Sequence, residues 1–275
     1  MVIREKQKLG PLQWCLIGVC SLFLVVMLIL PLIYVLVTAF SDGIRTFIQA
    51  VNERYALHSI FLTLEVTVIT VLINTVFGIF AAWCLTRFQF RGKKVFSALI
   101  DLPLTVSPII AGLIFILTFG RQSFLYPYLQ SAGIKIIFAL PGIVLATIFV
   151  TFPFISREII PVLNSNGTDE EEAAALMGAG GITIFRKVTF PHIKWAFLYG
   201  IVLCTARAMG EFGAVSVLSG HLQGKTNTMP LYIEILYQGN DFTGAFAISA
   251  ILVLIAVVIL VLRSVLERKG ADENE

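Results

Sequence analysis

Residues 169–191 read DEEEAAALMGAGGITIFRKVTFP and interrupt a chain that is otherwise built from long apolar runs. The stretch opens with four acidic residues, continues with strongly helix-forming alanines and is then broken by three glycines. Acidic side chains favour the first turn of a helix, because the backbone dipole is positive there. A charged and compact helical segment held between two apolar runs is typical of a docking surface that projects from a membrane domain.

The composition indicates an integral membrane protein. Of the 275 residues, 57% are hydrophobic and only 13% are charged, and the mean hydropathy is +0.90. A soluble domain carries roughly twice that charged fraction, so this chain lacks the polar surface that water requires. We therefore expect the lipid bilayer as a partner. The net charge of +3 gives no indication of nucleic-acid binding.

The apolar runs predict an all-α membrane protein with six transmembrane helices in a single domain over residues 1–275. A helix needs about 20 apolar residues to cross the hydrocarbon core. The first run is longer than the apolar region of a signal peptide and lacks a small-residue cleavage site, so we expect it to be retained. The expected spans cover residues 14–40, 60–86, 96–119, 139–161, 195–218 and 244–262.

Lysine and arginine predict the orientation, because they are enriched on the cytoplasmic side of membrane proteins. Fourteen of the twenty lie at one set of span ends and five at the other, with Arg207 inside a span. The bias predicts that both termini and the loop over 162–194 are cytoplasmic. The larger set is Arg4, Lys6, Lys8, Arg87, Arg91, Lys93, Lys94, Arg157, Arg186, Lys187, Lys194, Arg263, Arg268 and Lys269; the smaller set is Arg45, Arg54, Arg121, Lys135 and Lys225.

Within the loop, Thr168 and Glu171 have the spacing of a capping box. An apolar stripe follows at the i, i+3 and i+4 positions of Ala173, Leu176 and Met177. The glycines should then end the first helix, and a second short helix should end at Pro191, before the fifth span. Composition alone favours an ordinary amphipathic connector that lies on the membrane.

The spacing of the loop resembles the EAA loop of ABC importer membrane subunits, whose pattern is E-A-A-x3-G-x9-I-x-L-P. Phe190 stands where leucine is usual, and Val188 stands where isoleucine is usual. The resemblance implies a type I ABC importer permease fold and a helical loop that sits in a cleft of an ABC ATPase dimer and transmits its closure. The residues that it assigns to ATPase coupling are Glu172, Ala173, Ala174, Gly178, Val188 and Pro191. We call residues 162–194 the EAA-type loop.

The fifth expected span contains RAMGEFG over 207–213. Arg207 and Glu211 lie one helical turn apart and can pair, and charges inside a membrane tend to face the bundle interior or a water-filled path. Ala206, Gly210 and Ala214 form a stripe of small residues that would let another helix approach. Two interpretations stay open: Arg207 attracts an anion along the path, or the Arg207–Glu211 pair fixes helix packing.

Several segments resemble sulfate and molybdate permeases, and the Met-Gly-Glu-Phe-Gly form is most similar to the W-type membrane subunit of sulfate/thiosulfate importers. The resemblance implies a multi-pass subunit of the bacterial inner membrane. Its implied partners are a T-type permease, an ATPase dimer and a periplasmic sulfate-binding protein. A molybdate/tungstate importer permease and a self-sufficient secondary anion transporter are the alternatives. The segments are NTVFGIFAAW, LPLTVSPIIAGL, TFPFISREIIPVL and RAMGEFGAVSVLSG.

Nothing in the sequence predicts catalytic residues, a metal site or a cofactor. The four cysteines fall in apolar runs without metal-ligand spacing, and the three histidines lie far apart. Residues 224–226 read GKT, but the first glycine of a phosphate-binding loop would be at Ser219. We therefore expect ATP hydrolysis on a separate subunit. Two further expectations are a kink at Pro103 and Pro108 in the third span and a hydrogen bond between helices from Asn74.

Overall fold

The computed structural model describes residues 10–272, and the regular elements of this part are all helical. Long apolar segments form helices because lipid offers no partner to a free backbone N–H. The first half contains α1 (Pro11–Leu24), the π-helical turn η1 (Val25–Ile29), α2 (Leu30–Ala39), α3 (Ile44–Val51), α4 (Arg54–Arg87), α5 (Lys93–Thr105), α6 (Pro108–Phe119) and α7 (Tyr126–Ser131). The second half contains α8 (Leu140–Thr151), α9 (Pro153–Asn166), α10 (Asp169–Leu176), α11 (Gly181–Ile184), the π-helical turn η2 (Phe185–Thr189), α12 (Phe190–Met209), α13 (Gly213–Ser219), α14 (Met229–Gln238) and α15 (Phe242–Asp272).

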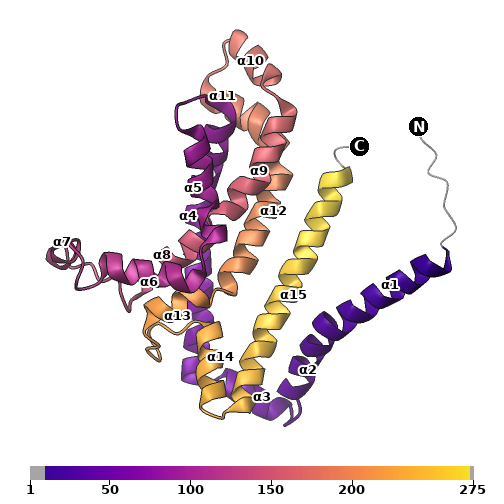
Figure 1. The fold of residues 1–275 in the computed structure, drawn as a ribbon, viewed down its shortest axis with the longest axis vertical. Helices are drawn as coiled ribbons and strands as arrows, with labels where there is room; N and C mark the ends of the chain where they lie inside the picture. Colours follow the sequence, from indigo (N-terminus) through magenta and orange to yellow (C-terminus); the bar gives the residue numbers. More distant parts are fainter. Residues whose placement is uncertain (1–9, 273–275) are drawn as a thin grey trace.

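In the described part of the chain, five helical stretches are long and apolar enough to cross a bilayer. Figure 1 shows α4, α9 and α12 side by side, with α15 beside α12. The bent pair of α5 and α6 makes a sixth crossing if the two helices form one span. The five stretches are Pro11–Ala39, Arg54–Arg87, Leu140–Asn166, Gly181–Met209 and Phe242–Arg268.

The third expected span, 96–119, is not one straight helix. Helices α5 and α6 meet at 110°, which is a break and not the simple kink that the sequence predicts. The local backbone geometry permits the break. A residue before proline is driven into extended backbone, and Ser107 has a ψ of 132° directly before Pro108. Pro108 then occupies the first position of α6, where a missing N–H has no cost.

The fifth expected span, 195–218, is also divided. Helix α12 ends at Met209, residues 210–212 form a break, and α13 begins a new direction at Gly213. The short helix α13 packs closely on α6. A side chain at Gly112 of α6 would place its Cβ 2.8 Å from the carbonyl oxygen of Ala214. The two broken segments therefore meet each other, a contact that neither the predicted kink in the third span nor the predicted continuous fifth span included.

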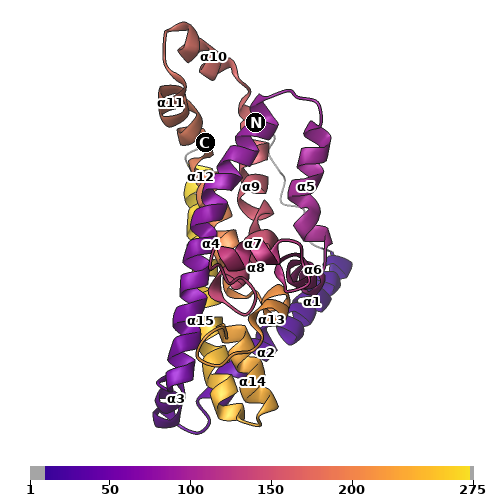
Figure 2. The same ribbon diagram turned by 90° about the vertical axis from the view of Figure 1, so that its left-hand side faces the viewer.

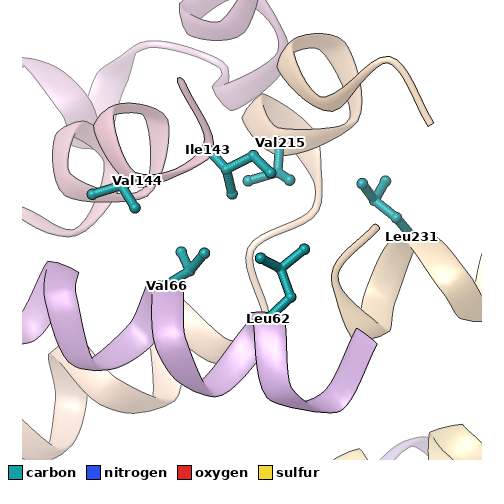
Figure 3. Close-up of a cluster of buried hydrophobic side chains, with 6 residues drawn as sticks. All are labelled: Leu62, Val66, Ile143, Val144, Val215 and Leu231. Carbon is teal, nitrogen blue, oxygen red and sulfur yellow. The ribbon is translucent and has the colours of Figure 1, made fainter. Parts of the chain in front are cut away.

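A buried apolar cluster joins α13 and α14 to the bundle (Figure 3). The six side chains lie on four elements that are distant in the sequence, and they point toward one another across α4. The cluster packs α13 and α14 against α4 and α8, and inside a membrane such contacts stabilise helix packing through van der Waals attraction. Its members are Leu62, Val66, Ile143, Val144, Val215 and Leu231.

The first helix stands apart from the bundle. Figure 1 shows α1 leaving at an angle, and every residue from Pro11 to Leu24 is exposed. Its continuation α2 packs against α15. An exposed helix of this apolar character is suited to contact with lipid or with another membrane subunit.

Candidate functional site: the EAA-type loop and the helix break

The EAA-type loop projects from one end of the molecule. Figures 1 and 2 both show α10 beyond the ends of the long helices and α11 beside the end of α4, with α3 and α14 at the opposite end. Three large apolar residues of the loop, Leu176, Met177 and Ile182, are almost fully exposed. Apolar side chains gathered on an exposed tip indicate a surface that another protein covers.

Helix α10 ends at a glycine. Helix α10 is followed by Gly178, whose φ of +85° lies in the left-handed region. The N–H of Gly178 donates to the carbonyl of Ala175 at 2.9 Å, and the N–H of Ala179 donates to that of Ala174 at 3.0 Å. This arrangement is a glycine-terminated helix end. The EAA pattern thus has glycine at this position because the backbone adopts a left-handed conformation that residues with a Cβ adopt poorly.

The predicted capping box is wrong. The side chain of Thr168 makes no cap hydrogen bond to the helix backbone; its hydroxyl donates to Oε1 of Glu172 at 2.8 Å. Glu171 instead turns toward the bundle, where its Oε2 lies 2.9 Å from Nε of Arg87. The local pattern gave no sign of this contact, because Arg87 precedes Glu171 by 84 residues.

The prediction of a separate second helix that ends at Pro191 is also wrong. Residues Gly181–Met209 form one continuous helical stretch, and Pro191 lies in the first turn of α12. The wide turn η2 precedes it, with the N–H of Phe190 bonded to the carbonyl of Phe185. Such a wide turn lets the helix continue past Pro191, which has no backbone N–H to donate and whose ring would crowd a regular α-helical turn. The EAA-type loop is therefore joined to α12 without a hinge at Pro191.

Arg207 and Glu211 form an ion pair at the helix break. Nη1 of Arg207 lies 2.6 Å from Oε2 of Glu211, and the two side chains are 32% and 1% exposed. The other carboxylate oxygen of Glu211 accepts a hydrogen bond from the N–H of Ala214 at 2.9 Å. Glu211 therefore holds the end of α12 and the start of α13 together.

The expected stripe of small residues does not form a single contact face. Gly210 ends α12, and in the described structure a Cβ at this position would meet only the carbonyl oxygen of Ala206, at 3.7 Å. Ala214 lies on α13 and packs against Gly112. The break at 210–212 separates the members that the sequence pattern had placed on one helix.

Two polar contacts join transmembrane segments: the expected one from Asn74, and an ion pair that the sequence did not predict. Asn74 of α4 donates to the hydroxyl of Thr151 at 2.8 Å, which confirms the predicted hydrogen bond between helices. Asp101 and Arg157 form an ion pair of 2.8 Å between α5 and α9. The buried bond from Asn74 stabilises the packing of α4 on α8, whereas the pair between α5 and α9 is exposed and contributes little.

Comparison with known proteins identifies the family. The model of the binding-protein-dependent transport system inner membrane component family matches residues 74–270, a region that includes both the EAA-type loop and the helix break. The chain belongs to this family. It is therefore a permease subunit of an ABC transporter.

Individual relatives extend the match over nearly the whole permease. The sulfate transport system permease protein CysW of Escherichia coli (strain K12) is 46% identical over 263 residues, which cover 96% of this chain and 90% of that protein. A probable sulfate transport system permease protein cysT of Mesostigma viride is 36% identical over 239 residues, covering 87% and 89%. The greater identity to the W-type protein agrees with the resemblance of the Met-Gly-Glu-Phe-Gly segment.

The fold is found in a solved transporter. A chain in the crystal structure of a bacterial alginate ABC transporter, in complex with an alginate pentasaccharide-bound periplasmic protein, superimposes with a TM-score of 0.78. The match covers 94% of each chain at 17% sequence identity. This confirms the expected all-α fold of an ABC importer permease.

Proposed function

We propose that this permease is the W-type membrane subunit of an ATP-driven sulfate importer. The observation that carries the proposal is the 46% identity to a sulfate CysW permease over 96% of this chain. The same similarity favours sulfate or thiosulfate over molybdate and tungstate, and favours an ABC importer over a self-sufficient secondary transporter. Its remaining partners would be a T-type permease, an ABC ATPase dimer and a periplasmic sulfate-binding protein.

The EAA-type loop would be the contact with the ATPase. Its exposed tip offers Leu176, Met177 and Ile182, and contiguous exposed apolar side chains mark protein interaction sites. Gly178, with its left-handed φ of +85°, ends α10 directly after two of these residues. Within the pattern, Glu172 and Ala173 are exposed as well, so they are available to the same partner.

The orientation follows from the same assignment. An ATPase partner is cytoplasmic, so the EAA-type loop would face the cytoplasm of a bacterium, with the subunit in the inner membrane. The fourteen lysine and arginine residues that share the loop's side of the predicted spans support this orientation. Both termini would then be cytoplasmic.

The Arg207–Glu211 pair would serve packing at the helix break. The pair already neutralises both charges at 2.6 Å, and Glu211 also bonds α13. A cation occupied in this way is less available to a passing anion. Gly210 would allow the sharp end of α12 beside the pair.

Reconstitution tests the proposed function. The complete complex, in proteoliposomes with ATP inside and the binding protein outside, should accumulate labelled sulfate, and excess molybdate should compete weakly. Uptake of molybdate in preference to sulfate would refute the substrate assignment. Sulfate flux through this chain alone, driven by an ion gradient, would refute the assignment as an importer subunit.

A further inference from the structure

Helix α10 is attached to the bundle by a cluster of side chains that the EAA pattern does not contain. We define the Arg87 anchor as Arg87, Glu171, Thr189 and the backbone carbonyl of Leu163. Nη2 of Arg87 donates to Oε1 of Glu171 at 2.9 Å, and Nη1 donates to the Leu163 carbonyl at 2.9 Å. The hydroxyl of Thr189 donates to the same Oε1 at 2.8 Å. Four elements, α4, α9, α10 and η2, therefore meet at one guanidinium and one carboxylate.

The anchor is sheltered from solvent. The side chains of Arg87 and Glu171 are 10% and 18% exposed, and Thr189 is buried. Oε1 of Glu171 accepts hydrogen bonds from both Arg87 and Thr189, and hydrogen bonds to a charged group are stronger than those between neutral groups. Exposed ion pairs, in contrast, contribute little. The Arg87–Glu171 contact is thus sheltered, whereas the neighbouring contact between Glu170 Oε2 and His192 Nε2, at 2.7 Å, is exposed.

The backbone on either side of α10 is poorly suited to transmit force. Gly167 before the helix has a φ of +68° and Gly178 after it has a φ of +85°. Glycine at both ends leaves the chain conformationally permissive there. Without side-chain contacts, α10 would pivot at these two points when a partner moves it. The Arg87 anchor is the buried polar contact that opposes such a pivot.

We infer that Arg87 and Glu171 are positioning residues that transmit movement of α10 to the transmembrane helices α4 and α12. Arg87 is the last residue of α4, so displacement of Glu171 acts directly on the end of a 34-residue helix. Thr189 extends the connection into the continuous stretch Gly181–Met209, which ends at the Arg207–Glu211 pair. This inference rests on the proposed role of the EAA-type loop as the ATPase contact.

The experiment measures sulfate uptake and ATP hydrolysis on the same reconstituted complex. Arg87→Met should leave ATPase association unchanged but lower the sulfate transported per ATP hydrolysed by about tenfold. Arg87→Lys, which keeps the charge but not the two-pronged geometry, should fall between this variant and the wild type. Arg91→Met is the matched control: it removes an exposed cation at the same end of α4 and should change the ratio by less than about twofold.

A structural role alone would reduce the amount of assembled complex and leave the transport ratio of that complex at the wild-type value. That result, for Arg87→Met, would overturn the inference. If Arg87→Met fails to assemble, Glu171→Gln supplies the same measurement with a nearly isosteric neutral side chain, and an unchanged ratio would again overturn it. Failure of the wild-type chain to bind any ATPase would instead refute the proposed function.

Discussion

Separate and joint replacement of Arg207 and Glu211 tests the role of the ion pair at the helix break. Arg207→Met leaves a carboxylate that is 1% exposed with one remaining hydrogen bond, from Ala214. Removing one partner of a buried pair costs about 3–5 kcal/mol. Because Arg207 is 32% exposed, we expect the lower end of this range, about 3 kcal/mol.

Glu211→Gln has a different consequence. Its amide oxygen can still accept the hydrogen bond from Ala214, while Arg207 loses its counter-charge but retains partial access to polar surroundings. We expect a cost of about 2 kcal/mol. In the double variant neither charge remains, so the total cost should be at least about 2 kcal/mol smaller than the sum of the two single costs.

The assay is the free energy of unfolding of the purified subunit in mixed micelles, measured for the four members of the double-mutant cycle. Costs that simply add would refute the reasoning, because additive changes mean that the two side chains do not stabilise each other. Sulfate uptake by the reconstituted complex gives a second readout. If the double variant regains stability but not uptake, Arg207 acts on the anion and the packing interpretation fails.

Three further substitutions test the fold and the proposed docking surface. Gly112→Ala places a Cβ 2.8 Å from the carbonyl oxygen of Ala214 and should destabilise the subunit by about 1–3 kcal/mol in a thermal-unfolding assay. Gly18→Ala is the control in the same assay, because a Cβ at Gly18 would meet no atom of the described structure within 4 Å. Gly178→Ala must adopt a φ of +85°, so it should cost about 1–2 kcal/mol and weaken ATPase binding in a pull-down. Leu176→Glu should abolish ATPase binding with an unchanged unfolding midpoint, since the side chain is exposed; normal binding would contradict the docking role.

Local signals predicted the segments that depend on local physics. Apolar length is sufficient to identify a helix that can cross the bilayer, so the stretches around residues 60–86 and 244–262 were identified from the sequence. The glycine that ends α10 was also evident, because Gly178 follows a run of alanines. The sequence also predicted that Asn74 makes a hydrogen bond between helices, but it did not identify Thr151 as the partner.

Breaks inside apolar runs were missed for a physical reason. Hydropathy depends on composition and length, so it does not indicate the direction in which a helix runs. A proline or glycine in an apolar run permits either a kink or a full reversal of the chain. At Pro108, packing of α6 on α13 selects a bend of 110°. At Gly210, the bonds of Glu211 to Arg207 and to Ala214 hold the break. Each choice depends on contacts between segments that local periodicity does not describe.

The sequence alone therefore determined that this protein is a helical membrane subunit with an EAA-type loop, because apolar length and motif spacing are properties of short segments. The tertiary structure decided what holds that loop. The capping box of Thr168 and Glu171 fitted every local rule, yet Glu171 pairs with Arg87 at 2.9 Å. A carboxylate gains more from a sheltered guanidinium than from a cap exposed to water, and only the fold brings residues 87 and 171 together.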